Sequence, residues 1–338
     1  AESVLGAGRE LEEGPGLSVL AAQMPDTWIR PLSPPQLAAI SRHGRPDQPP
    51  EADVPRPSLP GNPRAIVLMI DPFSVSASRL LTGLKRTWPE VPVAGAMASA
   101  GQEPGDNRLW LGGRVFDRGA VAVAIGGEVD VRCVVSQGCK PIGQPWVITR
   151  SKRHVVQELG GQPALEAVRT TLSSLDAAER ERVDGRGLLV GRVINEYQDR
   201  FGRGDFLIRG VVGVDREAGY LAIGDPRVAV GQTIQFHVRD AQTAAEDFDL
   251  LLDGEAMHGT AAGALLINCN GRGRRLFDQP DADVSRIGRA LGNPPLAGCF
   301  AAGEIGPVGD QSYVHGHSAS LVVFRAPGAG SQTSVTDV

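Results

Sequence analysis

The sequence predicts a mixed α/β protein with two lobes, in which repeated β-α-β-β units form mixed sheets covered by helices. The chain has 338 residues, of which 41% are hydrophobic and 22% are charged, and this suffices for two domains with sizeable cores. The segments 65–125 and 264–324 also share one order of strand, helix, strand and closing strand. A shared order of this kind indicates an internal repeat.

In the first half, short apolar runs bounded by turn residues predict the strands. The run Leu17 to Ala22 predicts a buried strand, and the proline-rich stretch 31–63 predicts a loop or connector, because proline disrupts ladders and helix interiors. A helix is expected to begin at Ser74 as its cap and to end before Pro89. Further strands are expected at residues 65–70, 91–96, 109–116 and 120–125.

In the second half, an amphipathic helix is expected at 163–175, and the polar, charged stretch 176–186 marks the boundary between the lobes. A further helix over 244–252 is expected to begin at Thr243. Strands are expected at residues 188–193, 206–214, 220–224, 232–238, 264–269 and 319–324. The expected domains are residues 1–180, residues 181–327 and a disordered tail over 328–338.

Two features tie the proposed copies together. In each, a helix ends at a proline and the next strand carries an Ala-Gly pair, Ala94-Gly95 in one copy and Ala297-Gly298 in the other. Residues 1–22 look like the glycine-rich loop and closing strand of a third copy, which predicts that roughly 30 residues or more of a first strand and helix are absent before them. An irregular leader is the alternative. On the first interpretation, the strand at Leu17 to Ala22 pairs at a sheet edge that lacks its usual neighbour.

Composition excludes several classes of function. The formal net charge is -5 with no block of Lys or Arg, which argues against nucleic acid as a partner. The longest apolar runs are too short to cross a bilayer, so no membrane partner is expected. Cys133, Cys139, Cys269 and Cys299 form no CxxC pair and suit a reducing compartment, so we expect free thiols and a cytoplasmic protein. Nucleotide-binding fingerprints are not found at the glycine turn, and no cofactor is expected.

Three stretches near the C-terminus resemble the C-terminal domain of the FIST family: LINCNGRGRRLF (266–277), PLAGCFAAGEIGPVG (295–309) and YVHGHSASLVVF (313–324). The opening AESVLGAG is similar to part of the N-terminal FIST domain. The resemblance implies a sensory module of intracellular signal transduction that binds a small molecule, such as an amino acid or a similar small carboxylate. It implies no established reaction and an unidentified signalling partner. No segment corresponds to the F-box of eukaryotic relatives.

The glycine turn after strand 264–269 is the first candidate for ligand contacts. Its residues are Cys269, Asn270, Gly271, Arg272 and Gly273. Glycines let backbone N–H groups converge on an anion, and the Arg272 guanidinium can bind a carboxylate with two parallel hydrogen bonds. An equally weighted alternative is a turn whose arginine is solvated or paired with a structural acid.

Glu304, next to Gly303, is the second candidate. A carboxylate among glycines and apolar residues is either buried with a donor or faces a pocket, where a ligand amine is its partner. The alternative is a structural salt bridge to Arg272 or Arg209. Because loops after parallel strands open at one sheet edge, Arg272 and Glu304 are expected in one pocket, and Arg272→Ala is expected to weaken binding with little loss of stability.

His315 is expected to line the same pocket. An alternative function is a cysteine-dependent acyl-transfer or hydrolase enzyme, with Cys269 as nucleophile and His315 as base. Another is a protein-interaction scaffold with an exposed apolar patch. The spacing of His315 and His317 superficially suits a metal, but no third ligand accompanies them, so we expect no metal site and a binding protein rather than an enzyme.

Overall fold

The structure of the protein is a computed structural model that describes residues 1–44, 56–198, 200–202 and 204–328. It is a mixed α+β protein, as predicted. It divides into two compact units: unit 1 comprises 1–136, 248–314 and 318–338, and unit 2 comprises 137–247 and 315–317. The boundary expected at residue 180 therefore falls inside unit 2. The expected tail lies outside the described residues beyond Gly328, as do residues 45–55 of the expected connector.

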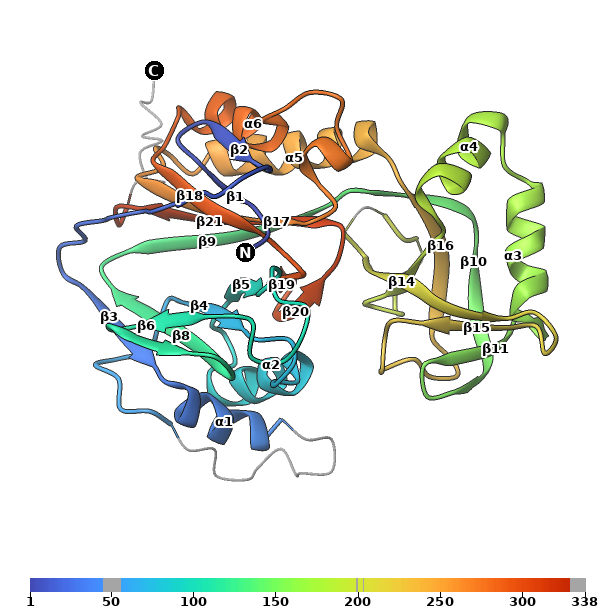
Figure 1. Ribbon diagram of the computed structural model, residues 1–338, viewed down its shortest axis with the longest axis horizontal. Coiled ribbons are helices and arrows are strands. Elements are labelled where there is room, and N and C mark those ends of the chain that lie inside the picture. The colour runs from blue at the N-terminus through green and yellow to red at the C-terminus, as the bar shows by residue number, and fades with distance from the viewer. Residues whose placement is uncertain (45–55, 199, 203, 329–338) are drawn as a thin grey trace, which may run out of the picture. The chain divides into compact units, whose positions relative to one another are not determined.

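Unit 1 contains two six-stranded sheets that face each other (Figure 1). Sheet A has the order β2-β1-β18-β17-β21-β9, and sheet B has the order β20-β19-β5-β4-β8-β3. The strands of sheet A are β1 (Val4–Gly6), β2 (Arg9–Leu11), β9 (Asp130–Gln137), β17 (Gly263–Cys269), β18 (Leu296–Ala301) and β21 (Ser318–Arg325). Those of sheet B are β3 (Thr27–Leu32), β4 (Ala65–Ile70), β5 (Val93–Met97), β8 (Ala120–Gly127), β19 (Gly303–Val308) and β20 (Gln311–His315). A separate hairpin consists of β6 (Leu109–Leu111) and β7 (Arg114–Phe116).

Helices cover the outer face of each sheet, which makes unit 1 a four-layer sandwich (Figure 1). Helices α1 (Pro34–Arg42) and α2 (Ala77–Thr87) pack on sheet B, and α5 (Ala241–Ala256) and α6 (Ala282–Leu291) pack on sheet A. The helices bury apolar side chains three or four positions apart, as an amphipathic helix does. Residues such as Val67, Ile125 and Val322 fill the space between the sheets.

Each sheet is built around one parallel pair. Strands β4 and β5 pair in parallel with Leu68 opposite Gly95, and β17 and β18 pair in parallel with Leu266 opposite Gly298. In both pairs, a Cβ on the glycine would lie 1.8 Å from the carbonyl oxygen of the leucine. The glycine of each Ala-Gly pair is thus required by close approach of the neighbouring backbone. Duplication of one ancestral unit stays a prediction.

The strand expected at Leu17 to Ala22 is wrong. Residues 15–24 form neither helix nor strand, and the edge of sheet A is instead the hairpin β1-β2, whose β1 pairs with β18. Leu17 and Val19 are 86% and 70% exposed, and Leu20 packs partly against the core. An apolar run does not make a strand when no neighbouring strand offers it hydrogen bonds.

The connector expected at 31–63 is also wrong in its first part, which forms the end of β3 and helix α1. Pro34 occupies the first turn of α1, where a missing backbone N–H costs nothing because no intrahelical partner exists. The Gln36 side chain accepts a hydrogen bond from the Ser33 backbone N–H at 2.9 Å, and Leu37 and Ile40 are buried. The proline-free stretch after Pro35 is therefore an ordinary amphipathic helix.

Two helix starts also differ from expectation. Helix α2 begins after Ser76 rather than Ser74, whose hydroxyl donates to Asp71 at 2.5 Å. Helix α5 begins at Ala241, and the Asp240 carboxylate accepts hydrogen bonds from the backbone N–H and the hydroxyl of Thr243 at 2.8 and 2.6 Å. A carboxylate at the cap is favoured because it also faces the positive end of the helix dipole.

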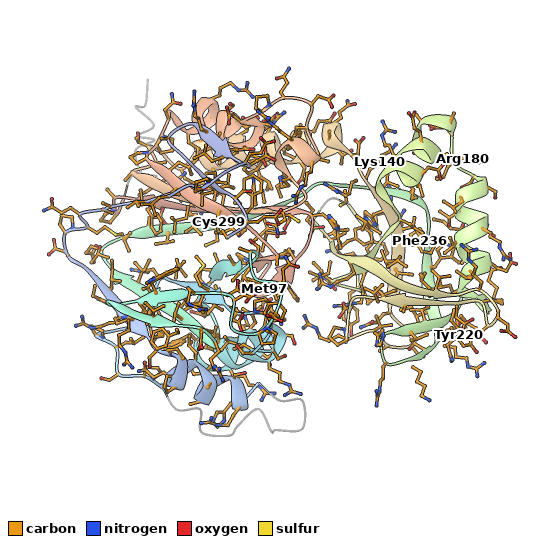
Figure 2. The ribbon with its side chains drawn as sticks, viewed as in Figure 1. Met97, Lys140, Arg180, Tyr220, Phe236 and Cys299 are labelled. Atoms are coloured by element: carbon orange, nitrogen blue, oxygen red, sulfur yellow. The ribbon has the colours of Figure 1, made fainter. Side chains whose placement is uncertain are left out.

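Unit 2 is a closed antiparallel sheet with two helices. The strands follow the order β10-β16-β13-β14-β15-β11-β12, and a further pairing of β10 with β11 closes the sheet. They are β10 (Cys139–Lys152), β11 (Val155–Leu159), β12 (Gln162–Pro163), β13 (Leu189–Val193), β14 (Phe206–Asp215), β15 (Tyr220–Ile223) and β16 (Thr233–Arg239). The helices are α3 (Ala164–Ser173) and α4 (Ala177–Arg186). The predicted hairpin of β14 and β15 is confirmed, and Phe236, labelled in Figure 2, is fully buried in the core.

Unit 2 should lose stability in acid. Burial lowers the pKa of His237 to about 4, and burial with the charge of Arg239 lowers the pKa of His317 to about 4, from an ordinary 6.5. The unfolded chain binds these protons first, so the free energy of unfolding falls between pH 6.5 and 4 by about 1.4 kcal/mol per pH unit and group. Urea unfolding, read by hydrogen exchange of residues 137–247, gives the free energy of unfolding of unit 2 at each pH. Its slope against pH should be smaller for His237→Gln than for the wild type. The exposed control His154→Gln should keep the slope, and an unchanged slope in His237→Gln contradicts the assignment.

Candidate functional site

The carboxyl ends of β17 and β18 meet at one edge of sheet A. The Asn270 backbone N–H, after β17, donates to the Ala301 carbonyl at the end of β18 at 3.0 Å. The Ala302 N–H donates to the Met97 carbonyl at 3.2 Å, so the end of β5 lies there too. The topology thus brings the turn 270–273 beside Ala302 and the start of β19, at the kind of edge where α/β proteins bind ligands.

Arg272 lies in the interior beneath α6. Its side chain is 1% exposed, and its Nε and Nη2 donate to Asp283 at 2.8 and 2.7 Å. The Asn268 amide also donates to Asp283 at 2.9 Å, and the guanidinium lies 5.8 and 5.3 Å from the ring centroids of Phe248 and Phe277. The arginine is therefore paired with a structural acid, which was the alternative to a ligand clamp. Among the described residues its Nη1 has no hydrogen-bond partner.

Glu10 is a further acid of this cluster, and sequence reasoning missed it. Its Oε1 accepts from the backbone N–H groups of Asp283 and Val284 at 2.9 and 3.1 Å, in the first turn of α6. Burial, and then the neighbouring Asp283, raises the pKa of Glu10 to about 7. Glu10 stands in an ordinary polar stretch far from Asp283 in the chain, so no pattern signalled it.

Glu304 is fully buried near the start of β19. Its Oε2 accepts hydrogen bonds from the backbone N–H and the hydroxyl of Ser318 at 3.1 and 2.7 Å. Burial raises the pKa of Glu304 to about 8, although Ser318, Arg272 and Cys269 lower it in part. Glu304 is therefore protonated at neutral pH, and its Oε1 has no hydrogen-bond partner of normal geometry among the described residues. The expected alternative partner Arg209 lies in unit 2 and pairs with Asp225 at 3.6 Å.

Cys269 belongs to the partly exposed part of this group. Cys269, Asn270 and Gly271 are partly exposed, whereas Gly273 and Gly303 are buried. The Gly271 backbone N–H donates to the Cys269 sulfur at 3.4 Å. The thiol lies close enough to Glu304 and Arg272 to influence their pKa values.

The glycine turn does bind carboxylates, and they belong to the chain itself. The Arg274 backbone N–H donates to both Glu12 oxygens at 2.9 and 3.0 Å, and the Asn270 amide donates to Glu2 at 2.7 Å. Gly273 has a φ of +60°, and a Cβ there would lie 2.5 Å from the Glu12 carboxyl carbon. The N-terminal segment thus supplies the acids that this turn was expected to take from a ligand.

His315 ends β20, is 3% exposed and belongs to unit 2 together with His317. Its convergence with Cys269 and Glu304 stays a prediction. Within the part of the chain that the structure describes, no group of three His, Cys, Asp or Glu side chains is placed to hold a metal ion. In that same part, no helix has the length and apolarity needed to cross a membrane.

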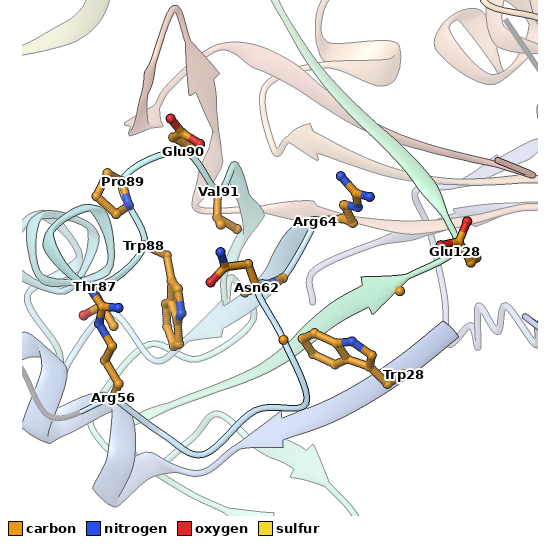
Figure 3. A pocket seen from close by; sticks show the side chains of 13 residues that line it. Trp28, Arg56, Asn62, Arg64, Thr87, Trp88, Pro89, Glu90, Val91 and Glu128 are labelled. Atoms are coloured by element: carbon orange, nitrogen blue, oxygen red, sulfur yellow. The ribbon is translucent and has the colours of Figure 1, made fainter. Parts of the chain in front are cut away.

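A separate cavity of about 760 Å³ lies at the amino end of β4 (Figure 3). Its walls include Trp28, Trp88, Arg64 and Glu128. None of the predicted site residues lines it. Because it adjoins the start of the parallel strand rather than its end, it is a different place from the predicted loops.

Glu304 should make unit 1 less stable as pH rises. The folded state keeps a proton up to about pH 8 that the unfolded state releases near 4.5, so the free energy of unfolding falls across this window by about 1.4 kcal/mol per pH unit. Glu304→Gln removes this contribution. Urea titrations at pH 5, 6, 7 and 8 should therefore show a free energy of unfolding that falls less with pH in this variant than in the wild type. The exposed control Glu13→Gln should follow the wild type. A Glu304→Gln slope equal to that of the wild type would show that the carboxyl is ionised in the folded protein.

The fold, with its two mixed sheets and their covering helices, defines a mixed α/β protein. The sequence matches the FIST N domain over residues 3–162 and the FIST C domain over residues 164–307. The chain therefore belongs to the FIST family, whose domains are associated with sensory modules of signal transduction.

Relatives occur in mycobacteria. The chain is 43% identical over 260 residues to the uncharacterized protein Rv0628c of Mycobacterium tuberculosis, a match that covers 76% of this chain and 67% of the relative. It is 42% identical over 260 residues to the uncharacterized protein Mb0898c of Mycobacterium bovis, with the same coverage. The border between the two family domains, near residue 163, precedes α3 and lies within unit 2.

Proposed function

We propose that the chain is the small-ligand-binding part of a sensory module, and that the ligand binds at the carboxyl ends of β17 and β18. The observation that carries this proposal is a buried donor, Arg272 Nη1, which has no hydrogen-bond partner among the described residues and lies near the buried Glu304 carboxyl. The two side chains interact electrostatically. A buried polar atom without a partner costs about 1–3 kcal/mol, so a ligand that supplies an acceptor to Arg272 gains affinity.

A small zwitterion such as an amino acid has the matching chemistry. Its carboxylate would accept from Arg272 Nη1, and its ammonium would pair with Glu304, which would ionise because an adjacent cation favours the charged form. Cys269, Asn270 and Gly271 would form the entrance because they are partly exposed. The backbone at Gly303 and Gly273 would border the ligand.

Calorimetric titration with the common amino acids and with small carboxylates at pH 7 tests this function. We expect saturable binding of at least one zwitterion, with a rise in melting temperature, since a ligand at about 100 times its Kd stabilises by ~2.7 kcal/mol. Glu304→Gln keeps the size of the side chain and removes the anionic partner of the amine, so affinity should fall at least tenfold. Glu13→Gln is the matched control. Equal affinity in Glu304→Gln, or no binding of any compound, overturns the assignment.

A second candidate function, cysteine chemistry at Cys269, rests on one contact. The Gly271 N–H donates to the sulfur and the Arg272 charge lies near it, and both would stabilise a thiolate. Alkylation by iodoacetamide at pH 7, followed by peptide mass spectrometry, should then modify Cys269 faster than the buried Cys139. Equal and slow labelling of both thiols would exclude this function.

A further inference from the structure

We propose that unit 1 holds a second binding site, for an apolar molecule that carries one amine. A cavity of about 620 Å³ opens between sheets A and B. This volume falls in the usual range for small-molecule sites, roughly 300–1,000 Å³. The side chains that line it include Leu20, Met24, Ile29, Ile125, Val129, Leu265 and Phe324.

The walls are apolar and come from several segments. Leu265 and Phe324 come from sheet A, Ile125 comes from sheet B, and residues 20–25 border the cavity from the N-terminal side. Residues 15–24 have no helix or strand, so they can move without breaking a ladder of backbone hydrogen bonds. An opening into the apolar space between the sheets favours an aliphatic or aromatic group over a sugar or a nucleotide, because polar groups there would lose their water without gaining partners.

The charges around the cavity select the head group. Asp26 and Glu128 line it, and neither forms an ion pair within the described part of the chain. Arg325 also lines the cavity, but its guanidinium is fully buried and is bound to the Glu255 carboxylate at 3.1 Å and to the Glu255 carbonyl at 2.7 Å. Arg64 lines the neighbouring cavity with Glu128 and makes no ion pair with it (Figure 3). The accessible charge is therefore negative, which favours an ammonium group over a carboxylate.

This site is separate from the one proposed above. Gly263 begins β17, whereas Cys269 ends it, so the cavity and the Cys269–Glu304 group lie at opposite ends of the same strand. The inference therefore does not depend on amino-acid binding.

Displacement of the fluorescent probe N-phenyl-1-naphthylamine by octylamine, octan-1-ol and octanoate tests the proposal. We expect all three to compete, with octylamine at least fivefold tighter than octan-1-ol and octanoate the weakest. The double variant Asp26→Asn with Glu128→Gln removes both acids. It should bind octylamine and octan-1-ol with equal affinity, and its affinity for octan-1-ol should equal that of the wild type. The amino-acid panel should not displace the probe, which separates this site from the proposed function.

Two variants of the wall locate the binding. A Cβ on Gly263 would lie 3.6 Å from the Pro295 carbonyl and 3.8 Å from Leu20, so Gly263→Leu can be accommodated at its Cβ and fills the cavity. We expect at least a tenfold loss of octylamine affinity. Ile29→Ser changes a side chain that is 48% exposed at the rim and should weaken binding about threefold without unfolding the sheet. Gly254→Leu, on an open face of α5, is the control that should bind normally.

Three results would overturn the proposal: no saturable competition by any of the three compounds, a preference for octanoate, or unchanged affinity in the wall variants. Circular dichroism and the melting temperature show whether Gly263→Leu is folded. If it is not, Ile29→Ser decides alone, because its side chain lies on the edge strand β3.

Discussion

Replacing Arg272 with methionine is expected to lower the free energy of unfolding of unit 1 by about 3–5 kcal/mol, because Asp283 would remain as a buried charge without its partner. Both side chains are essentially inaccessible to water, at 1% and 0% exposure. The Asn268 amide would still donate to Asp283, but it carries no positive charge that could replace Arg272. The nearby backbone N–H group of Asp283 is already bound to Glu10. The expectation that Arg272→Ala costs little stability is therefore corrected by the burial of this pair. Urea unfolding at pH 7 gives the measurement.

Two further variants separate the ion pair from its surroundings. Arg272→Met combined with Asp283→Leu removes both charges and should recover most of the loss, since an apolar pair of similar volume needs no solvation. Arg275→Met breaks an exposed ion pair, in which the Arg275 side chain is 59% exposed and the Glu2 side chain is 37% exposed. This variant should change the free energy of unfolding by less than about 1 kcal/mol. An Arg272→Met protein within about 1 kcal/mol of the wild type would contradict the stabilising role of this ion pair.

Gly298→Ala is expected to destabilise unit 1 by about 3 kcal/mol or more, the upper part of the range for overpacking. The new Cβ would lie 1.8 Å from the Leu266 carbonyl oxygen, and neither atom belongs to a flexible side chain. Strands β17 and β18 would have to separate, which breaks their parallel register. Gly95→Ala should behave alike, because its Cβ would meet the Leu68 carbonyl at the same distance.

Gly254→Ala is the matched control, and it should raise the free energy of unfolding where Gly298→Ala lowers it. This glycine lies in α5, and a Cβ there would meet no atom within 4 Å. Alanine should stabilise the helix by about 0.5–1 kcal/mol because it loses less conformational freedom on folding. Equal stabilities of Gly298→Ala and the wild type in urea would show that the two strands are further apart than described here.

The site was only partly predictable from the sequence. The pattern of strand, glycine turn and helix predicted that residues 270–273 lie beside residues 303–306, because the ends of parallel strands share an edge whatever the side chains are. For Glu304 it left two possibilities open, burial with a donor or a place facing a pocket, and the structure shows a buried carboxyl that accepts hydrogen bonds from Ser318. The pattern could not choose between Asp283 and a ligand as the partner of Arg272, since both offer the same carboxylate chemistry.

By itself, the sequence determined the elements whose signal is local: the strands at 65–70 and 264–269, the helix that ends before Pro89, and the hairpin of β14 and β15. Their apolar spacing and turn residues act within a few positions of the chain. Only the tertiary structure decided that Leu17 to Ala22 forms no strand. It also decided that Glu10 reaches the first turn of α6 and Glu12 reaches the glycine turn, each more than 250 positions away. A strand needs a neighbour and a buried charge needs a partner, and both are supplied by parts of the chain that folding, not sequence order, brings close.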